Sequence, residues 1–138
     1  MNPQTATLVR DSWAEIVPMR KQVCAGFYQR LFQRHPELRP LFKGDLDRQT
    51  SLFVTMLNTV VSSLENRDPV VALIKTVGVR HADYGVENDD YEKFAVVLLD
   101  SFAEALGERF TPEVRTAWAD VYRELADTMR QGAAEALH

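Results

Sequence analysis

The chain has 138 residues, the length of one domain, and 46% of them are hydrophobic while 26% are charged, as in an ordinary globular protein. Its formal charge of −4 argues against nucleic acid or an anionic membrane as a partner. No apolar run is long enough to span a membrane, the N-terminus lacks the basic and apolar regions of a signal peptide, and the single Cys24 has no disulfide partner in the chain. We therefore expect a single domain over residues 1–138, located in the cytoplasm.

The first half of the chain has the hydrophobic period of helices. Apolar side chains three or four residues apart form two stripes, which contain Leu8, Val9, Trp13, Ile16 and Val17, and then Val23, Cys24, Phe27, Tyr28, Leu31 and Phe32. Pro36 and Pro40 break the chain around a short helical turn. Asp45 or Asp47 can cap the long helix that follows. The stripe of that helix contains Gln49, Leu52, Phe53, Met56, Leu57, Val60, Val61 and Leu64.

Three more helices are predicted in the second half. Asp68-Pro69 and Thr111-Pro112 each indicate a cap followed by a proline in the first turn, and Asn88 or Asp89 can begin the helix between them. The stripes of the last two helices contain Tyr91, Phe94, Val97, Leu98, Ser101, Phe102 and Ala105, and then Val114, Ala117, Trp118, Val121, Tyr122, Leu125 and Met129. Glycine is too sparse and alternation too rare for a sheet, so the predicted class is all-α.

His81 stands near the end of the helix that Asp68-Pro69 opens, in the segment Val77-Gly78-Val79-Arg80-His81-Ala82-Asp83-Tyr84-Gly85-Val86. A neutral imidazole in this place can be the axial ligand of a haem iron, with its other ring nitrogen donating to the Val77 carbonyl one turn earlier. The alternative is a buried structural histidine, which is the commoner role of a lone histidine and needs a polar partner. Because an all-α bundle needs no cofactor, the helix pattern alone does not decide between them.

Three segments together resemble the globin family, particularly the bacterial single-domain haemoglobins and the globin portion of flavohaemoglobins. The segments are residues 27–42 (FYQRLFQRHPELRPLF), residues 78–86 (GVRHADYGV) and residues 117–122 (AWADVY), and their order and spacing fit globins across nearly the whole chain. The resemblance implies a globin fold, a three-over-three helical sandwich, holding one haem b (iron protoporphyrin IX).

The resemblance also implies roles for individual residues. His81 would be the proximal iron ligand, Phe42 would pack against the porphyrin face, and Gln49, which lies 32 residues before His81, matches the distal position. Tyr28 would lie on the distal wall, and Phe53, one turn after Gln49, would set the volume of the pocket. The other expected haem contacts are Val77, Val86, Tyr91, Phe94 and Leu98.

The sequence departs from the family pattern at two places. The segment from Lys43 to Arg48 is short, so we expect the small helix that many globins place before the distal helix to be missing. Flavohaemoglobins carry a proximal glutamate fifteen residues after the tryptophan of the last helix, and here that position is Ala133. Glu135 lies two residues further on, which rotates it well round the helix. We therefore expect a less strongly electron-donating proximal histidine.

Each assignment has a structural alternative. Tyr28 could be a core tyrosine with a satisfied hydroxyl, and Gln49 an exposed glutamine that swings to solvent. Tyr91 begins an apolar stripe, where a tyrosine often sends its hydroxyl to solvent, and Arg80 is either a propionate partner or a solvated charge. The apolar positions fit ordinary helix packing as well as haem contact; they are Phe42, Phe53, Val77, Val86, Phe94 and Leu98.

Three functions remain open at this stage. The first is binding of oxygen, and of nitric oxide and carbon monoxide, with Tyr28 and Gln49 as distal donors whose hydrogen bonds slow oxygen release and suit scavenging. The second is an enzyme, nitric oxide dioxygenase, which would need a separate reductase because we find no residues for a flavin or nicotinamide domain. The third is a haem-based gas sensor, for which the chain shows no output domain. Ala133 favours gas binding over the dedicated oxidative enzyme.

Overall fold

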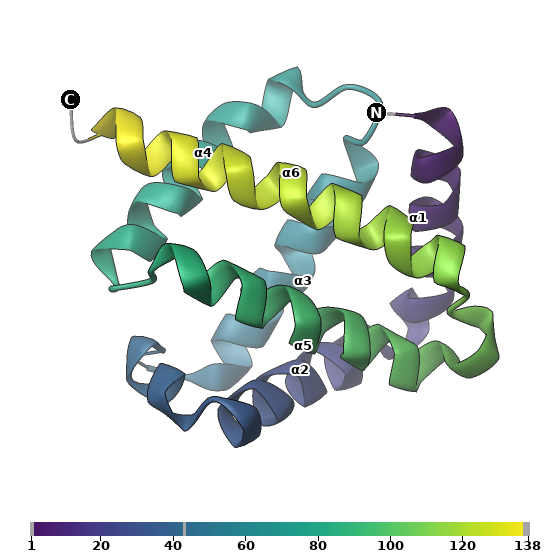
Figure 1. The fold of residues 1–138 in the computed structure, drawn as a ribbon, viewed down its shortest axis with the longest axis horizontal. Helices are drawn as coiled ribbons and strands as arrows, with labels where there is room; N and C mark the ends of the chain where they lie inside the picture. The colour runs from purple at the N-terminus through teal and green to yellow at the C-terminus, as the bar shows by residue number, and fades with distance from the viewer. Residues whose placement is uncertain (1, 43, 137–138) are drawn as a thin grey trace.

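The structure of the protein, a computed structural model, describes residues 2–42 and 44–136, and this part of the chain contains helices and turns but no strand. The α-helices are α1 (Pro3–Ile16), α2 (Arg20–Arg34), α3 (Leu46–Ser62), α4 (Asp68–Asp83), α5 (Asn88–Leu106) and α6 (Pro112–Ala136). Short 3-10 helices lie between some of them: η1 (Val17–Met19), η2 (Pro36–Leu41) and η3 (Gly107–Arg109). The absence of strands from this part of the chain confirms the predicted all-α class, and in Figure 1 α5 and α6 cross in front of α3. None of the described helices is both long and apolar enough to cross a membrane.

Side-chain caps begin most of the helices. The Asp45 carboxylate accepts a hydrogen bond from the Asp47 backbone N–H at 2.9 Å, which confirms Asp45 as the cap of α3. Thr111 caps α6 by accepting from the Val114 backbone N–H at 3.2 Å. The prediction for Asp68 was wrong by one residue, because Asp68 is the first residue of α4 and the flanking position belongs to Arg67, whose side chain makes no capping bond. A carboxylate in the first turn still interacts favourably with the helix dipole.

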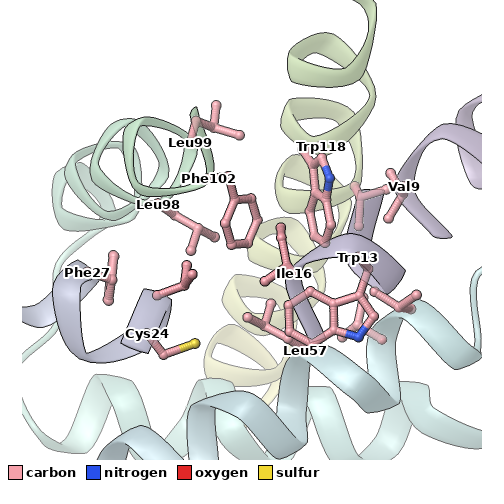
Figure 2. Close-up of a cluster of buried hydrophobic side chains, with 14 of the residues drawn as sticks. Val9, Trp13, Ile16, Cys24, Phe27, Leu57, Leu98, Leu99, Phe102 and Trp118 are labelled. Atoms are coloured by element: carbon pink, nitrogen blue, oxygen red, sulfur yellow. The ribbon is translucent and has the colours of Figure 1, made fainter. Parts of the chain in front are cut away.

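The main core is built around two tryptophans. The Trp118 ring packs edge-on against Phe102 and Trp13, with ring centroids 4.7 Å and 6.1 Å apart, respectively. Both indole N–H groups are satisfied within the protein: Trp118 donates to the Ser12 hydroxyl at 2.8 Å, and Trp13 donates to the Asn58 side chain at 2.7 Å. Figure 2 shows these rings surrounded by aliphatic side chains from the neighbouring helices. The core therefore ties α1, α3, α5 and α6 together with no indole donor left unpaired.

Helix α4 is held by α6. Among the described residues, α4 makes extensive contact with α6 alone, and the ribbon of α6 passes across it in Figure 1. The contact runs through two buried glycines: a Cβ added at Gly78 would clash with the backbone of Met129, and one added at Gly132 would lie 2.5 Å from the carbonyl oxygen of Lys75. Since Gly78 lies beside Met129 and Lys75 beside Gly132, the two helices run antiparallel with their backbones in contact.

Adding a methyl group at Gly132 tests this contact. Backbone atoms cannot rotate away from the new Cβ, so we expect Gly132→Ala to lower the free energy of unfolding by about 1–3 kcal/mol despite the better helix propensity of alanine. The matched control is Gly26→Ala in the middle of α2, where nothing lies within 4 Å of an added Cβ. This substitution should raise the free energy of unfolding by about 0.5–1 kcal/mol. Urea unfolding followed by circular dichroism measures both, and effects of the same sign would contradict the close helix contact.

Candidate functional site

His81 lies in the last turn of α4 with its side chain half-buried. Its Nδ1 lies 2.8 Å from the Val77 carbonyl oxygen, and because a carbonyl only accepts, Nδ1 carries the proton. Burial lowers the pKa of His81 below its ordinary value, and the hydrogen bond to Val77 opposes this only in part. The ring is therefore neutral at pH 7. Nε2 has no hydrogen-bond partner among residues 2–42 and 44–136, so its lone pair is available to a metal.

Six aromatic side chains gather where α2, α3 and α5 meet the end of η2. We call them the aromatic cluster, and they are Phe27, Tyr28, Phe32, Phe42, Phe53 and Phe94. The Tyr28 ring is the hub, because its centroid lies 5.4 Å from that of Phe42 and 5.9 Å from that of Phe53. Phe94 joins through Phe42, with centroids 6.3 Å apart. The cluster thus brings together four residues that the sequence predicts to line one pocket.

The Tyr28 hydroxyl and the Gln49 side chain form a polar pair at this cluster. Burial raises the pKa of Tyr28 well above its ordinary value, and the nearby polar Gln49 side chain opposes the increase. Gln49 is half-buried in the first turn of α3, where its backbone N–H donates to the Asp45 carbonyl at 3.1 Å. The phenol therefore stays protonated and remains a hydrogen-bond donor with an amide beside it.

A second apolar group lies between α4, α5 and α6. We call it the α4–α6 core, and it contains Ile74, Val70, Val77, Val86, Tyr91, Tyr122, Leu125, Ala126 and Met129. Tyr91 is 6% exposed and lies inside this group, and the Tyr122 hydroxyl donates to the Tyr91 carbonyl at 2.6 Å. Leu98 instead belongs to the main core, where it is 3% exposed. The predicted contact residues are therefore divided between two apolar groups.

The connection after α4 brings the His81 end of that helix close to the segment that carries Phe42. Gly85 has a φ of 97°, and a Cβ added there would lie 3.3 Å from the Leu41 side chain. The backbone N–H of Val86 donates to the His81 carbonyl at 3.0 Å, which closes the turn. His81 thus shares one end of the molecule with the aromatic cluster.

These residues fit a flat, apolar cofactor with one metal atom. A neutral imidazole with a free Nε2 is the donor that haem iron takes on its proximal side, and the aromatic cluster and the α4–α6 core supply apolar walls. Helices α3 and α4, which carry Gln49 and His81, are not closely packed against each other in the described part of the chain. No group of three or more His, Cys, Asp or Glu that could hold a free metal ion occurs within residues 2–42 and 44–136.

The structure also shows the two positions at which the sequence departs from the globin-family pattern. Helix α3 begins at Leu46, and of the residues before it, Phe42, Gly44 and Asp45 are not helical, while Lys43 lies outside the described residues. Ala133 is half-buried, and the Glu135 carboxylate is held elsewhere by the Lys75 ammonium at 3.1 Å. No carboxylate from this part of α6 takes the place of the family's proximal glutamate.

Sequence reasoning missed Arg130, whose guanidinium lies 4.8 Å from the centroid of the Tyr91 ring. A charged residue next to a buried stripe usually faces solvent, so no sequence signal distinguished it. Arg80 is exposed and His35 is half-buried beside Glu37, with His35 Nδ1 3.4 Å from a carboxylate oxygen of that residue, while His138 lies outside the described residues.

Comparison with known proteins gives consistent matches. The family model described as Globin matches residues 25–129. A flavohemoprotein from Rhizobium meliloti is 33% identical over 132 residues, which cover 94% of this chain and 33% of that protein. Cytoglobin-2 from Danio rerio is 27% identical over 133 residues, covering 86% of this chain and 74% of that protein. The chain spans about a third of the length of the flavohemoproteins that it matches.

Two solved structures have the same arrangement of helices. An engineered carbene transferase from Rhodothermus marinus, named as a candidate nitric oxide dioxygenase, has a TM-score of 0.91 at 28% identity and covers 99% of this chain and 96% of that chain. A globin from Campylobacter jejuni shares the fold with a TM-score of 0.86 at 16% identity, with 99% of both chains covered. The helices therefore adopt the globin fold, and the family implies a haem cofactor. On the match over residues 25–129, this chain belongs to the globin family.

Proposed function

We propose that this protein binds haem b through His81 and holds oxygen on the opposite face with the Tyr28 hydroxyl and the Gln49 amide. The observation that carries the proposal is the pairing of these two side chains at the aromatic cluster, near a neutral histidine with a free Nε2. High-affinity oxygen binding or scavenging is the function that this set of residues supports best. Nitric oxide and carbon monoxide are the other diatomic ligands expected at the same position.

On the proximal side, the chain positions one nitrogen donor. When bound, haem would supply an iron atom that accepts diatomic gases. The Val77 carbonyl fixes the tautomer of His81 and its ring orientation. Because this acceptor is a neutral carbonyl and position 133 is an alanine, no carboxylate increases the basicity of the imidazole. Such a ligand favours reversible gas binding.

On the distal side, the chain provides two donors in an apolar setting. The Tyr28 phenol is protonated, and the Gln49 amide can donate beside it. A hydrogen bond to a charged acceptor contributes about 1.5–3 kcal/mol, so each donor could slow release of a ligand with anionic character by about 10- to 100-fold. Carbon monoxide stays nearly neutral and gains much less. The pair would therefore discriminate in favour of oxygen.

The second candidate function is nitric oxide dioxygenase, in which oxygen and nitric oxide combine to form nitrate. The names of two relatives favour it, since this chain matches a flavohemoprotein and a candidate nitric oxide dioxygenase. Forming nitrate from oxygen and nitric oxide consumes one electron per cycle, so this activity would need a reductase. The same distal donors would serve both functions. The two functions differ in whether a reductase supplies electrons.

Removing the imidazole of His81 tests haem binding. We expect His81→Ala to lose or severely weaken the Soret band of the purified protein, and added imidazole to restore it, because the substitution removes the proposed nitrogen ligand. The matched control is His35→Ala, which removes a half-buried histidine beside the Glu37 carboxylate at the end of α2 and should leave the spectrum unchanged. A normal haem spectrum in His81→Ala without imidazole would show that the ligand assignment is wrong.

Removing the hydroxyl of Tyr28 tests the distal pair. Tyr28→Phe keeps the ring contacts of the aromatic cluster, so we expect oxygen dissociation to accelerate about 10- to 100-fold while carbon monoxide dissociation changes by less than about threefold. Ligand-replacement stopped-flow measures both rates. The control is Tyr84→Phe, since Tyr84 is 56% exposed at the end of α4. Equal acceleration for the two gases would refute the hydrogen-bond argument.

Mixing the oxygenated protein with nitric oxide separates the two functions. If the protein is a dioxygenase, we expect stoichiometric nitrate in a single turnover and sustained nitrate formation when a reductase and its reduced nicotinamide are added. Nitrate formed once without sustained turnover would favour the oxygen-binding function.

A further inference from the structure

Arg130 is held against the Tyr91 ring by three contacts. Its guanidinium carbon lies 4.8 Å from the ring centroid, one terminal nitrogen lies 3.1 Å from the Asp127 carboxylate, and the other donates to the Asn88 carbonyl at 3.2 Å. The side chain thus bridges α6 to the first turn of α5. A cation over the face of a buried aromatic ring is favourable, and the ring holds the charge in a defined place.

One atom of this side chain points to a role beyond the bridge. Arg130 Nε is buried and has no hydrogen-bond partner among the residues that the structure describes. A guanidinium that served only to link α6 and α5 would be expected to satisfy every buried donor. The Arg130 guanidinium is therefore a partly desolvated positive charge at the edge of the protein interior.

The helix register places the backbone of Arg130 beside the α4 segment that positions His81. Gly78 touches Met129, the residue before Arg130, and α4 and α6 run antiparallel. Arg130 is accordingly level with Val77 and Gly78, one helical turn before His81 on α4. Tyr91, which the guanidinium covers, shares the α4–α6 core with Val77, whose carbonyl accepts from His81 Nδ1.

The nearest counter-charge does not cancel the field inside the protein. The side chain of Asp127 is 65% exposed whereas that of Arg130 is 32% exposed, so water screens the carboxylate more than the guanidinium. The guanidinium is therefore the less screened member of the Arg130–Asp127 pair. Ala133, one turn further along the same part of α6, adds no negative charge.

We propose that Arg130 is a positioning residue that makes the His81 side of the haem site electropositive and so favours ferrous over ferric haem. The inference rests on the proposed haem binding through His81. A nearby positive charge destabilises the oxidised state, which carries one more positive charge, and the reduction potential rises. A higher potential keeps a gas-binding haem in the ferrous state that binds oxygen.

The test measures the reduction potential of haem-loaded variants by spectroelectrochemical titration. In Arg130→Gln we expect the ferric-to-ferrous ratio at a fixed potential to increase at least threefold, which corresponds to a decrease in midpoint potential of about 28 mV for a one-electron couple. Arg130→Lys keeps the charge and should restore most of the difference. The control is Arg123→Gln, because Arg123 lies on the same helix with a side chain that is 71% exposed. It should leave the potential unchanged.

Asp127→Asn provides a test that does not depend on losing the arginine. Removing the screened carboxylate leaves the guanidinium less compensated, so the midpoint potential should rise in this variant. If Arg130→Gln is too unstable to isolate, this opposite shift decides the question. An unchanged or lower potential in Asp127→Asn, or a potential in Arg130→Gln that matches the Arg123→Gln control, would overturn the inference.

The outcomes separate this inference from the proposed function. A wild-type protein that binds no haem through His81, as the His81→Ala spectrum reports, would overturn both. If haem binding depends on His81 but the reduction potential does not change when Arg130 is replaced, the inference alone is overturned. A decrease in thermal stability without a change in potential would assign Arg130 to the α5–α6 bridge only.

Discussion

The candidate site depends on the backbone contact between α4 and α6. Gly78 and Gly132 allow the two helices to touch, and this contact positions α4 without requiring it to pack against α3. His81 can therefore stand at the end of a firmly held helix while the helix that carries Gln49 is attached to the other side of the molecule. Larger side chains at the two glycines would push α4 away from α6 and change the distance between His81 and Gln49.

The chemistry of the site depends on two polar side chains, His81 and Tyr28, that lie in apolar surroundings. Burial lowers the pKa of His81 and raises that of Tyr28, so both shifts reinforce the neutral forms of these side chains. Burial thus produces one nitrogen ligand and one hydroxyl donor without any charged residue in direct contact with them. The guanidinium over Tyr91 carries a charge of the opposite sign to that of the glutamate expected for flavohaemoglobins.

Much of the fold could be predicted from local patterns, whereas the site was only partly predictable. Hydrophobic spacing and proline-marked caps identified the six helices, because these signals depend on residues within a few positions of each other. The error at Asp68 was a single position, which is typical of helix ends. The Val77 carbonyl was correctly identified as the partner of His81, because it lies one turn away on the same helix. The division of the predicted contacts into the aromatic cluster and the α4–α6 core was not apparent, since it depends on how distant helices meet.

The sequence by itself determined the helical class, the candidate ligand His81 and the absence of the proximal glutamate at Ala133, because each is a property of residue type and spacing. Only the tertiary structure decided that Tyr28 pairs with Gln49, that Glu135 is bound to Lys75 and that Arg130 covers Tyr91. Each of these contacts joins residues on different helices, and their distances depend on helix crossing and register. Such geometry is set by packing of the whole core, for which a single sequence contains no local signal.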